Sequence, residues 1–369
     1  MKRCIAMAIT VVICLAIGAG AQAEQEYYSI LELIDTTPEH WTATYETQWR
    51  NVDVDVPITV PKVEAFPIIC VAASNPVDAS LLTPYQVVRY NSFGLFEART
   101  SRSDETIKSN WRYKSKITYP GTETEIPTPE NVTDNYSDVY NLARNEIKRL
   151  FGSSHDLVLE DITVMSCFYR FEKKGGQVTW YERKTDTGKY TLHFRPRYYG
   201  ITYQPAEECY DKLRLSHEKQ ISDSFVTFTF YSKENYKMLA TLYDEVNFVY
   251  EDVPLLSFDE AKTAIEELIY AGYLRSVETV ELCYIPYLDP NDSGILWLLP
   301  AWYVRGGYTR DPEREFTPYL DEETGEILDD GIERKEVIFQ AQLGTLIDYY
   351  DSRKSRRNVP EILTWEDLK

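Results

Sequence analysis

The chain is poor in the residues that most often carry catalysis or bind transition metals. Its 369 residues include only four histidines and six cysteines. No two cysteines are spaced as C-x-x-C, and the histidines lie far from them, which argues against a zinc site. The sequence also lacks a nucleophile elbow, a P-loop, a dinucleotide-binding fingerprint and an H-E-x-x-H helix. We therefore expect no metal, no cofactor and, on balance, no enzymatic activity.

Basic side chains are scarce relative to acids. The chain has 39 Lys and Arg against 59 Asp and Glu, a formal net charge of −20. Most of its surface would repel nucleic-acid phosphates, anionic lipid and acidic wall polymer. The exception is SRKSRR at 352–357, which either contacts acidic wall polymer or is a flexible tail. We expect a protein that is soluble outside the cell and binds no nucleic acid.

A long apolar run occurs only at the N-terminus. Lys2 and Arg3 precede the run at 4–20, and AQA at 21–23 has the small-x-small form of a cleavage site. We predict a cleaved signal peptide, a mature chain starting at Glu24, and a secreted or cell-envelope location. A retained anchor helix is the alternative, since a span needs ~20 apolar residues. Cleavage removes two basic residues and no acid, which makes the mature net charge −22.

Four cysteines remain after that cleavage: Cys70, Cys167, Cys209 and Cys283. In an exported protein they allow two disulfides with three possible connectivities, and the sequence does not choose among them. Cys70 and Cys283 both lie in apolar runs. For these two, a buried free thiol is the alternative to pairing.

The mature chain is long enough for two or three domains. We predict an N-terminal β-rich domain over 24–130, a first helix-plus-sheet module over 131–250, a second over 251–350, and a basic tail over 351–369. In the first region, NVDVDVPITV at 51–60 alternates apolar and polar residues with period two, which predicts a strand with one buried face.

Each predicted module begins with an amphipathic helix. SDVYNLARNEIKRLFG starts with Ser137 as the expected N-cap. SFDEAKTAIEELIYAG starts with a capping box of Ser257 and Glu260 and ends at Gly272. In both halves, a strand with an internal cysteine and then a strand with an internal proline follow. We therefore expect an α+β fold with a duplicated helix-on-antiparallel-sheet module.

The second half carries a family resemblance. LSFDEAKTAIEEL, VETVELCYIPY, LLPAWYVRGGY and EVIFQAQLGTLID follow each other in this order. The pattern resembles PepSY-type and YycH/YycI-type extracytoplasmic domains, and uncharacterised secreted proteins and lipoproteins of gut clostridia. It covers residues 225–350 well and 134–224 weakly. The resemblance implies a non-catalytic role at the cell envelope: binding a protein or peptide partner, restraining a peptidase, or modulating a sensor kinase.

One strand gathers the side chains best suited to an anionic ligand. In YTLHFRPRYYG, His193, Arg195 and Arg197 alternate on one face, and Tyr199 follows. Arginine forks hold carboxylates and phosphates with two parallel hydrogen bonds. The alternative is a solvated face that neutralises the protein's own carboxylates, and that interpretation is favoured.

The most apolar stretch of the mature chain is ILWLLPAWYVRGGY at 295–308. Trp302, Tyr303 and Arg305 are candidates for a partner-binding surface. Beside the related strand with His193, the stretch is better interpreted as the second copy of one proline-bent strand. We then expect Trp302 to lie in the core or at its half-buried rim.

The remaining candidate features are weak. DPNDSG at 289–294 begins like a calcium loop, but Pro300 stands where the bidentate glutamate belongs, so a hairpin turn is expected. His155 is interpreted as a loop histidine. The 29 tyrosines and 7 tryptophans, together with many acids, leave a second hypothesis open, a secreted hydrolase or carbohydrate-binding protein with a cleft.

Overall fold

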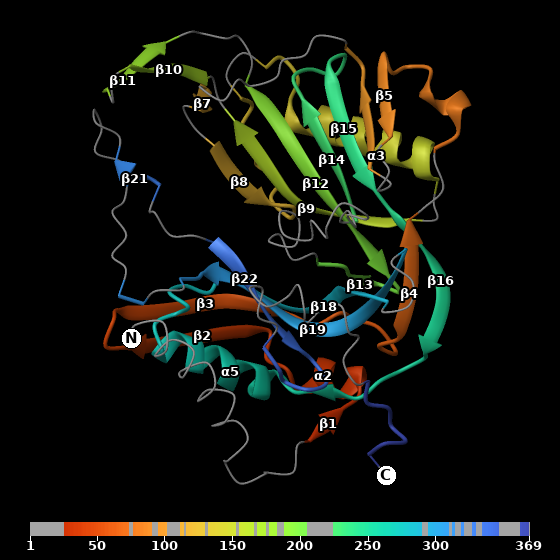
Figure 1. The fold of residues 1–369 in the computed structure, drawn as a ribbon, viewed down its shortest axis with the longest axis vertical. Helices are drawn as coiled ribbons and strands as arrows, with labels where there is room; N and C mark the ends of the chain where they lie inside the picture. The colour runs from red at the N-terminus through yellow and green to blue at the C-terminus, as the bar shows by residue number, and fades with distance from the viewer. Residues whose placement is uncertain are drawn as a thin grey trace.

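The computed structural model describes residues 26–73, 77–90, 95–101, 111–113, 116–129, 132–152, 155–165, 168–174, 177–182, 188–204, 224–289, 294–309, 312–313, 319–320, 327–329, 334–346 and 362–368. The predicted signal peptide and the segment SRKSRR lie outside these residues. The described part is mainly β and forms two large sheets, one above the other in Figure 1.

The upper sheet contains eight strands, and every neighbouring pair in it is antiparallel. Their order is β5-β6-β15-β14-β12-β9-β8, with β13 paired to the end of β12. The strands are β5 (Val87–Tyr90), β6 (Phe96–Arg99), β8 (Lys116–Pro120), β9 (Asp156–Met165), β12 (Lys189–Tyr198), β13 (Ile201–Thr202), β14 (Phe225–Phe230) and β15 (Tyr236–Thr241).

The lower sheet contains seven strands in the order β16-β4-β19-β18-β3-β2, with β22 also paired to β19. The pairing of β3 with β18 is parallel and the others are antiparallel. The strands are β2 (His40–Glu46), β3 (Asn51–Thr59), β4 (Ile68–Ala73), β16 (Tyr243–Tyr250), β18 (Thr279–Leu288), β19 (Ile295–Gly307) and β22 (Arg334–Gln340).

Smaller sheets complete the β structure. β1 pairs with β17, β10 lies between β7 and β11, and β20 pairs with β21. Their bounds are β1 (Tyr27–Tyr28), β7 (Trp111–Tyr113), β10 (Phe168–Lys174), β11 (Gln177–Glu182), β17 (Leu255–Leu256), β20 (Tyr319–Leu320) and β21 (Ile327–Asp329), and the short 3-10 helix η1 covers Ala79–Leu82.

The described residues include three α-helices, α2 (Ile30–Thr36), α3 (Tyr136–Phe151) and α5 (Phe258–Tyr270). The predicted capping box of α5 is confirmed: the Ser257 hydroxyl accepts from the Glu260 amide at 3.3 Å, and the Glu260 carboxylate accepts from the Ser257 amide at 3.0 Å. Gly272 follows the helix with φ 79°, a left-handed conformation that favours glycine. No helix of the described residues is long and apolar enough to cross a membrane.

The start of α3 differs from the expected one, and α2 was not predicted. α3 is capped by Asn135, whose side chain accepts from the Asp138 amide at 2.9 Å, and Ser137 lies inside the helix. Asparagine and serine are about equally good caps, so the choice depends on where the preceding chain enters. α2 has a second capping box, formed by Ser29 and Glu32.

The predicted α+β fold, an N-terminal β-rich region followed by two tandem helix-on-sheet modules, is wrong. The fold is mainly β, and N-terminal strands are distributed over both large sheets. β2, β3 and β4 join the lower sheet beside β18 and β19, whereas β5, β6 and β8 join the upper sheet. Hydrophobic periodicity predicts which face of a strand is buried, but it does not predict the strand beside it.

The expected duplication fails for the same reason. β9–β12 and β18–β19 are both antiparallel pairs that follow a helix, but their surroundings differ. β9 has an antiparallel neighbour in β8, whereas β18 has a parallel neighbour in β3. β12 pairs with β14, whereas β19 pairs with β4 along its first half and with β22 along its second half.

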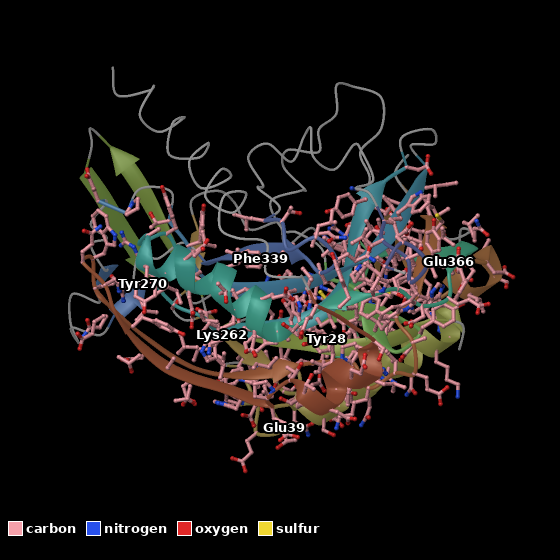
Figure 2. The ribbon with its side chains drawn as sticks, turned by 90° about the horizontal axis from the view of Figure 1, so that it is seen from below. Tyr28, Glu39, Lys262, Tyr270, Phe339 and Glu366 are labelled. Carbon is pink, nitrogen blue, oxygen red and sulfur yellow. The ribbon has the colours of Figure 1, made fainter. Side chains whose placement is uncertain are left out.

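Each large sheet has its own hydrophobic core. α3 contributes Val139, Ala143 and Ile147 to the upper core, and α5 contributes Ala261 and Ile265 to the lower one. In Figure 2, α5 runs along the β2–β3 hairpin, whose predicted alternation is confirmed: the valines of β3 and Ile58 are buried and the residues between them are exposed.

The two sheets meet at a junction. The chain passes directly from β15 in the upper sheet to β16 in the lower one. Tyr203 forms a parallel bridge with Tyr284, and the Gln204 amide donates to the Tyr284 carbonyl at 2.9 Å. The Tyr198 hydroxyl donates to the Tyr243 carbonyl at 3.0 Å.

Candidate functional site

The predicted anion-binding strand is β12, and its arginines are engaged with the protein's own acids. Arg195 Nε lies 2.5 Å from Glu160 Oε2, and both side chains are largely buried. Arg197 forms two hydrogen bonds to Asp156, at 2.8 and 3.1 Å, near the surface. Glu160 and Asp156 both come from the neighbouring strand β9. The pairs are those expected of a face that neutralises internal carboxylates.

His193 has similar local partners. Its Nδ1 lies 3.0 Å from the Thr227 hydroxyl on β14, and its Nε2 lies 3.9 Å from Asp161 on β9. His193, Arg195 and Arg197 thus link β12 to its neighbours within the upper sheet.

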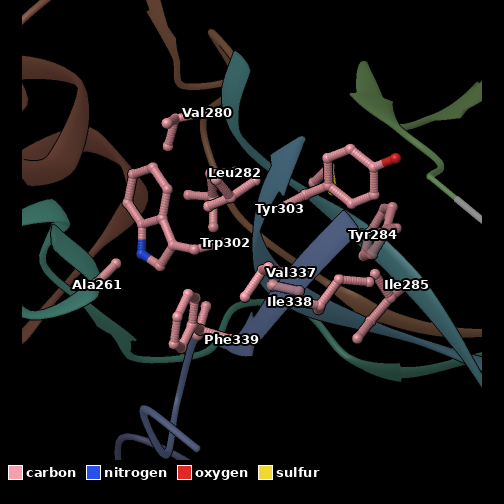
Figure 3. Close-up of a cluster of buried hydrophobic side chains, with 14 of the residues drawn as sticks. Ala261, Val280, Leu282, Tyr284, Ile285, Trp302, Tyr303, Val337, Ile338 and Phe339 are labelled. Atoms are coloured by element: carbon pink, nitrogen blue, oxygen red, sulfur yellow. The ribbon is translucent and has the colours of Figure 1, made fainter. Parts of the chain in front are cut away.

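The other predicted surface, Trp302, Tyr303 and Arg305, lies on β19. Trp302 is 1% exposed, Tyr303 is also buried, and Arg305 is half-buried. The Trp302 indole donates to the Leu256 carbonyl at 3.2 Å, and its ring contacts Phe258. Figure 3 shows it among Ala261, Val280 and Leu282. The prediction of a partner surface here is wrong for the two aromatic rings, because they are core side chains.

An exposed surface lies elsewhere on the lower sheet, at its edge strand β16. We define the β16 surface as Tyr199, Asp244, Glu245, Val246, Phe248 and Tyr250. β16 is an edge strand of the lower sheet and forms its right-hand rim in Figure 1; no strand of the described residues pairs with its outer edge. Residues 244–248 are exposed on both faces of the strand. Val246 is 55% exposed, and Phe248 and Tyr250 are each more than one-third exposed.

The backbone of β16 is irregular. Its register with β4 shifts between Glu245 and Asn247 and again between Phe248 and Tyr250. Such bulges bend an edge strand and interrupt its hydrogen-bonding row, which limits indiscriminate strand addition. Val246 is the residue skipped at the first shift, and it points an apolar side chain into solvent.

Tyr199 joins this surface from the turn after β12. Its backbone has φ 53°, uncommon for a residue other than glycine. Its ring contacts Phe248 edge-to-face at 5.5 Å, and its hydroxyl donates to Glu245 at 2.5 Å. The hydrogen bond to that carboxylate raises the pKa of Tyr199 to about 12. Of the four residues predicted for ligand binding, Tyr199 is the one found on an exposed aromatic surface.

A histidine lies beside the acidic part of the surface. His155 Nε2 is 3.4 Å from Asp244 Oδ1, and its ring packs edge-on against Phe151. Burial lowers the pKa of His155, against the opposing effect of Asp244. His155 therefore connects the end of α3 to β16, a larger structural role than that of an ordinary loop histidine.

Two cysteines lie in the described part of the chain. Cys70 and Cys283 are buried free thiols, on β4 and β18; Cys167 and Cys209 lie outside the described residues. Burial raises the pKa of both described thiols, which makes them unreactive. No group of three or more potential metal ligands occurs in the described part of the chain.

Asp289 accepts from the Trp297 indole at 2.7 Å, across the predicted β18–β19 hairpin.

Sequence reasoning missed most of the β16 surface. The signal was DEVNFVYED at 244–252, in which Val246, Phe248 and Tyr250 occupy alternate positions, with the apolar Val249 between the last two. Such alternation ordinarily predicts one buried face. Here β16 lies at the rim of the lower sheet, where Val249 packs against the lower core but Val246, Phe248 and Tyr250 remain exposed.

Comparison with known proteins bears on the fold. No protein-family model matches this chain, and no curated protein matches it at a significant level. A structural match is the 1.45 Å crystal structure of an uncharacterized protein from Eubacterium rectale ATCC 33656. It covers 86% of this chain and 97% of that one, with a TM-score of 0.50 and 12% sequence identity. At this identity, the likeness concerns the fold alone.

Proposed function

We propose that this protein is an exported, non-catalytic binding protein that holds an extended, basic segment of a protein partner along β16. The observation that carries the proposal is the exposure of Val246, Phe248 and Tyr250 on β16, whose outer edge pairs with no strand of the described residues. Exposed apolar side chains that form a patch, with polar residues around them, often mark an interaction surface. The predicted signal peptide and the resemblance to extracytoplasmic domains support a location outside the cytoplasm.

The charge around the patch supports a basic partner. The stretch 244–252 contains four acids and no Lys or Arg. Asp244 and Glu245 flank the apolar side chains directly, and Glu251 follows Tyr250. Complementary charge accelerates association and selects among partners, and its effect weakens with salt. A segment with lysines or arginines between apolar residues matches this arrangement.

The shape of the site supports an extended segment. An added strand can take main-chain hydrogen bonds from an open edge and place alternate side chains in contact with the surface. The two bulges of β16 restrict pairing to short stretches. Phe248 and the Tyr199 ring it contacts must then contribute much of the affinity, as aromatic residues commonly do at interfaces.

Binding can be tested with a capped ten-residue peptide of alternating lysine and valine, measured by fluorescence polarisation. We expect binding that weakens as salt rises, and a loss of about tenfold or more in affinity for Phe248→Ala. Ile117→Ala is the matched control, because Ile117 is an exposed apolar residue on β8, an edge strand of the other sheet. Equal binding of a glutamate–valine peptide, or unchanged affinity in Phe248→Ala, would refute the proposal.

The natural partner can be sought with a photo-crosslinking amino acid at position 248 in living cells, with position 117 as control. We expect a crosslinked product specific to position 248 whose partner sequence includes a basic, extended segment. Identical products from the two positions would argue against a dedicated site on β16.

A further inference from the structure

A second exposed aromatic surface lies at the opposite end of the lower sheet, where the β2–β3 hairpin meets the end of α5 (Figures 1 and 2). Trp49 in the hairpin turn is 37% exposed, and Tyr270 in the last turn of α5 is 54% exposed. Figure 2 shows Tyr270 at this end of the helix. We call these two side chains the hairpin platform.

The position of Trp49 is fixed on both sides. In the turn, the Thr47 hydroxyl accepts from the amides of Trp49 and Arg50, each at 3.1 Å, and donates to the Arg50 carbonyl at 2.7 Å. On the other side, the indole lies directly on the backbone of Gly272. A Cβ at Gly272 would come within 2.4 Å of the indole Cδ1 atom, so this contact requires glycine.

Tyr270 is held by a chain of ring contacts that reaches the core. Its ring contacts Tyr45 edge-to-face at 5.6 Å, and Tyr45 contacts Trp41 at 6.2 Å. Trp41 contacts Phe258, and Phe258 contacts Trp302, both within 6 Å. Aromatic rings held in this way lose little conformational entropy when a ligand binds.

Polar groups at the platform belong to α5 and the hairpin. The Tyr45 hydroxyl donates to Glu266 at 2.7 Å, and Lys262 Nζ lies 3.8 Å from the same carboxylate. The neighbouring Glu46 and Glu267 are exposed. Glu46, Glu266 and Glu267 outnumber Lys262 and the exposed Arg50 of the turn, so an acidic polymer would meet excess negative charge, whereas a neutral polymer with hydroxyl groups can donate hydrogen bonds to the carboxylates.

We propose that the hairpin platform binds a neutral polysaccharide. The apolar C–H faces of pyranose rings pack on exposed indole and phenol faces, and sugar hydroxyls pair with nearby acids and tyrosine hydroxyls. The rigid, partly exposed Trp49 and Tyr270 supply the rings, and Glu266 and Glu267 supply acceptors. This site is separate from the β16 surface and does not depend on peptide binding there.

Affinity gel electrophoresis tests the proposal with the full mature chain. Xylan, glucomannan, mixed-linkage β-glucan and amylopectin are each cast into native gels, with polygalacturonate as the charged comparison. We expect at least one neutral polysaccharide to retard the protein and polygalacturonate not to do so. Trp49→Ala and Tyr270→Ala should each abolish the retardation, and Trp49→Tyr, which retains a ring, should restore part of it.

Tyr90→Ala is the matched control, because Tyr90 is an exposed tyrosine of the upper sheet; it should be retarded like the unaltered protein. Circular dichroism melts identify any variant that has lost its fold. Tyr270→Ala is expected to keep the fold, because it removes mainly exposed surface. Absence of retardation in all four neutral gels would overturn the proposal, as would retardation that survives both alanine changes or that occurs equally in polygalacturonate. Binding of the lysine–valine peptide should be unaffected by Trp49→Ala, which separates this outcome from failure of the β16 proposal.

Discussion

The side-chain amide of Gln204 donates to the carboxylate of Glu281 at 3.1 Å, across the junction between the two sheets. Glu281 lies on β18 of the lower sheet, and Gln204 follows β13 of the upper sheet. Burial raises the pKa of Glu281 above its ordinary value of 4.5, even though its hydrogen bonds to Gln204 and Thr202 oppose this. The junction therefore contains a carboxyl group that is costly to ionise.

This shift predicts a pH-dependent contribution to stability. A carboxyl group whose pKa is higher in the folded than in the unfolded state stabilises the fold at low pH, and this contribution is lost as pH rises through the folded-state pKa. Glu281→Gln should therefore raise the free energy of unfolding at pH 7.5 relative to the unaltered protein, and have less effect at pH 4.5. Urea denaturation at both pH values measures this.

Glu267→Gln, on the exposed side of α5, is the control for loss of one negative charge. If Glu281→Gln is no more stabilising at pH 7.5 than at pH 4.5, ionisation of Glu281 does not strain the junction.

Trp302 should be among the most costly core residues to truncate. It is almost fully buried, contacts Phe258, and satisfies its indole nitrogen at the Leu256 carbonyl. Trp302→Ala should lower the free energy of unfolding by about 3–5 kcal/mol. Leu31→Ala, at an exposed position of α2, should change it by no more than about 0.5 kcal/mol. A similar effect of both changes in urea denaturation would contradict the core assignment.

The two arginines of β12 should differ in their contribution to stability. Arg195→Ala leaves the largely buried Glu160 without its partner and should cost about 1–3 kcal/mol. Arg197→Ala breaks a pair in which both side chains are at least 40% exposed, and should cost about 0–1 kcal/mol. Thermal melts of the two variants check which change costs more stability. Melts with and without phosphate check whether these arginines bind an anion. Marked stabilisation by phosphate that requires either arginine would revive the anion-site interpretation.

The capping box of α5 provides a local test. Ser257→Ala removes the acceptor for the Glu260 amide and should cost about 1 kcal/mol, and Ser257→Asp should recover most of it. Thr263→Ala, at an exposed position in the same helix, is the comparison. Equal melting temperatures for Ser257→Ala and the unaltered protein would show that the cap contributes little here.

Local patterns predicted individual elements well. The alternation of Val52, Val54 and Val56 with acids predicted a half-buried strand, and Ser257 with Glu260 predicted the start of a helix. Both follow from short-range geometry: side chains of a strand alternate between faces, and a serine three residues before a glutamate satisfies the first amides of a helix. The burial of Trp302 within its apolar run was also expected.

The assembly of those elements could not be predicted in the same way. The sequence alone determined the start of α5, the buried face of β3, the acidic charge and the scarcity of metal-binding residues, because each depends on neighbouring residues or on composition. Only the tertiary structure decided that β3 lies beside β18, that Arg195 pairs with Glu160, and that Phe248 and Trp49 are exposed while Tyr303 is buried. These outcomes depend on contacts between residues far apart in the chain, and the same apolar alternation serves a central strand or an exposed rim.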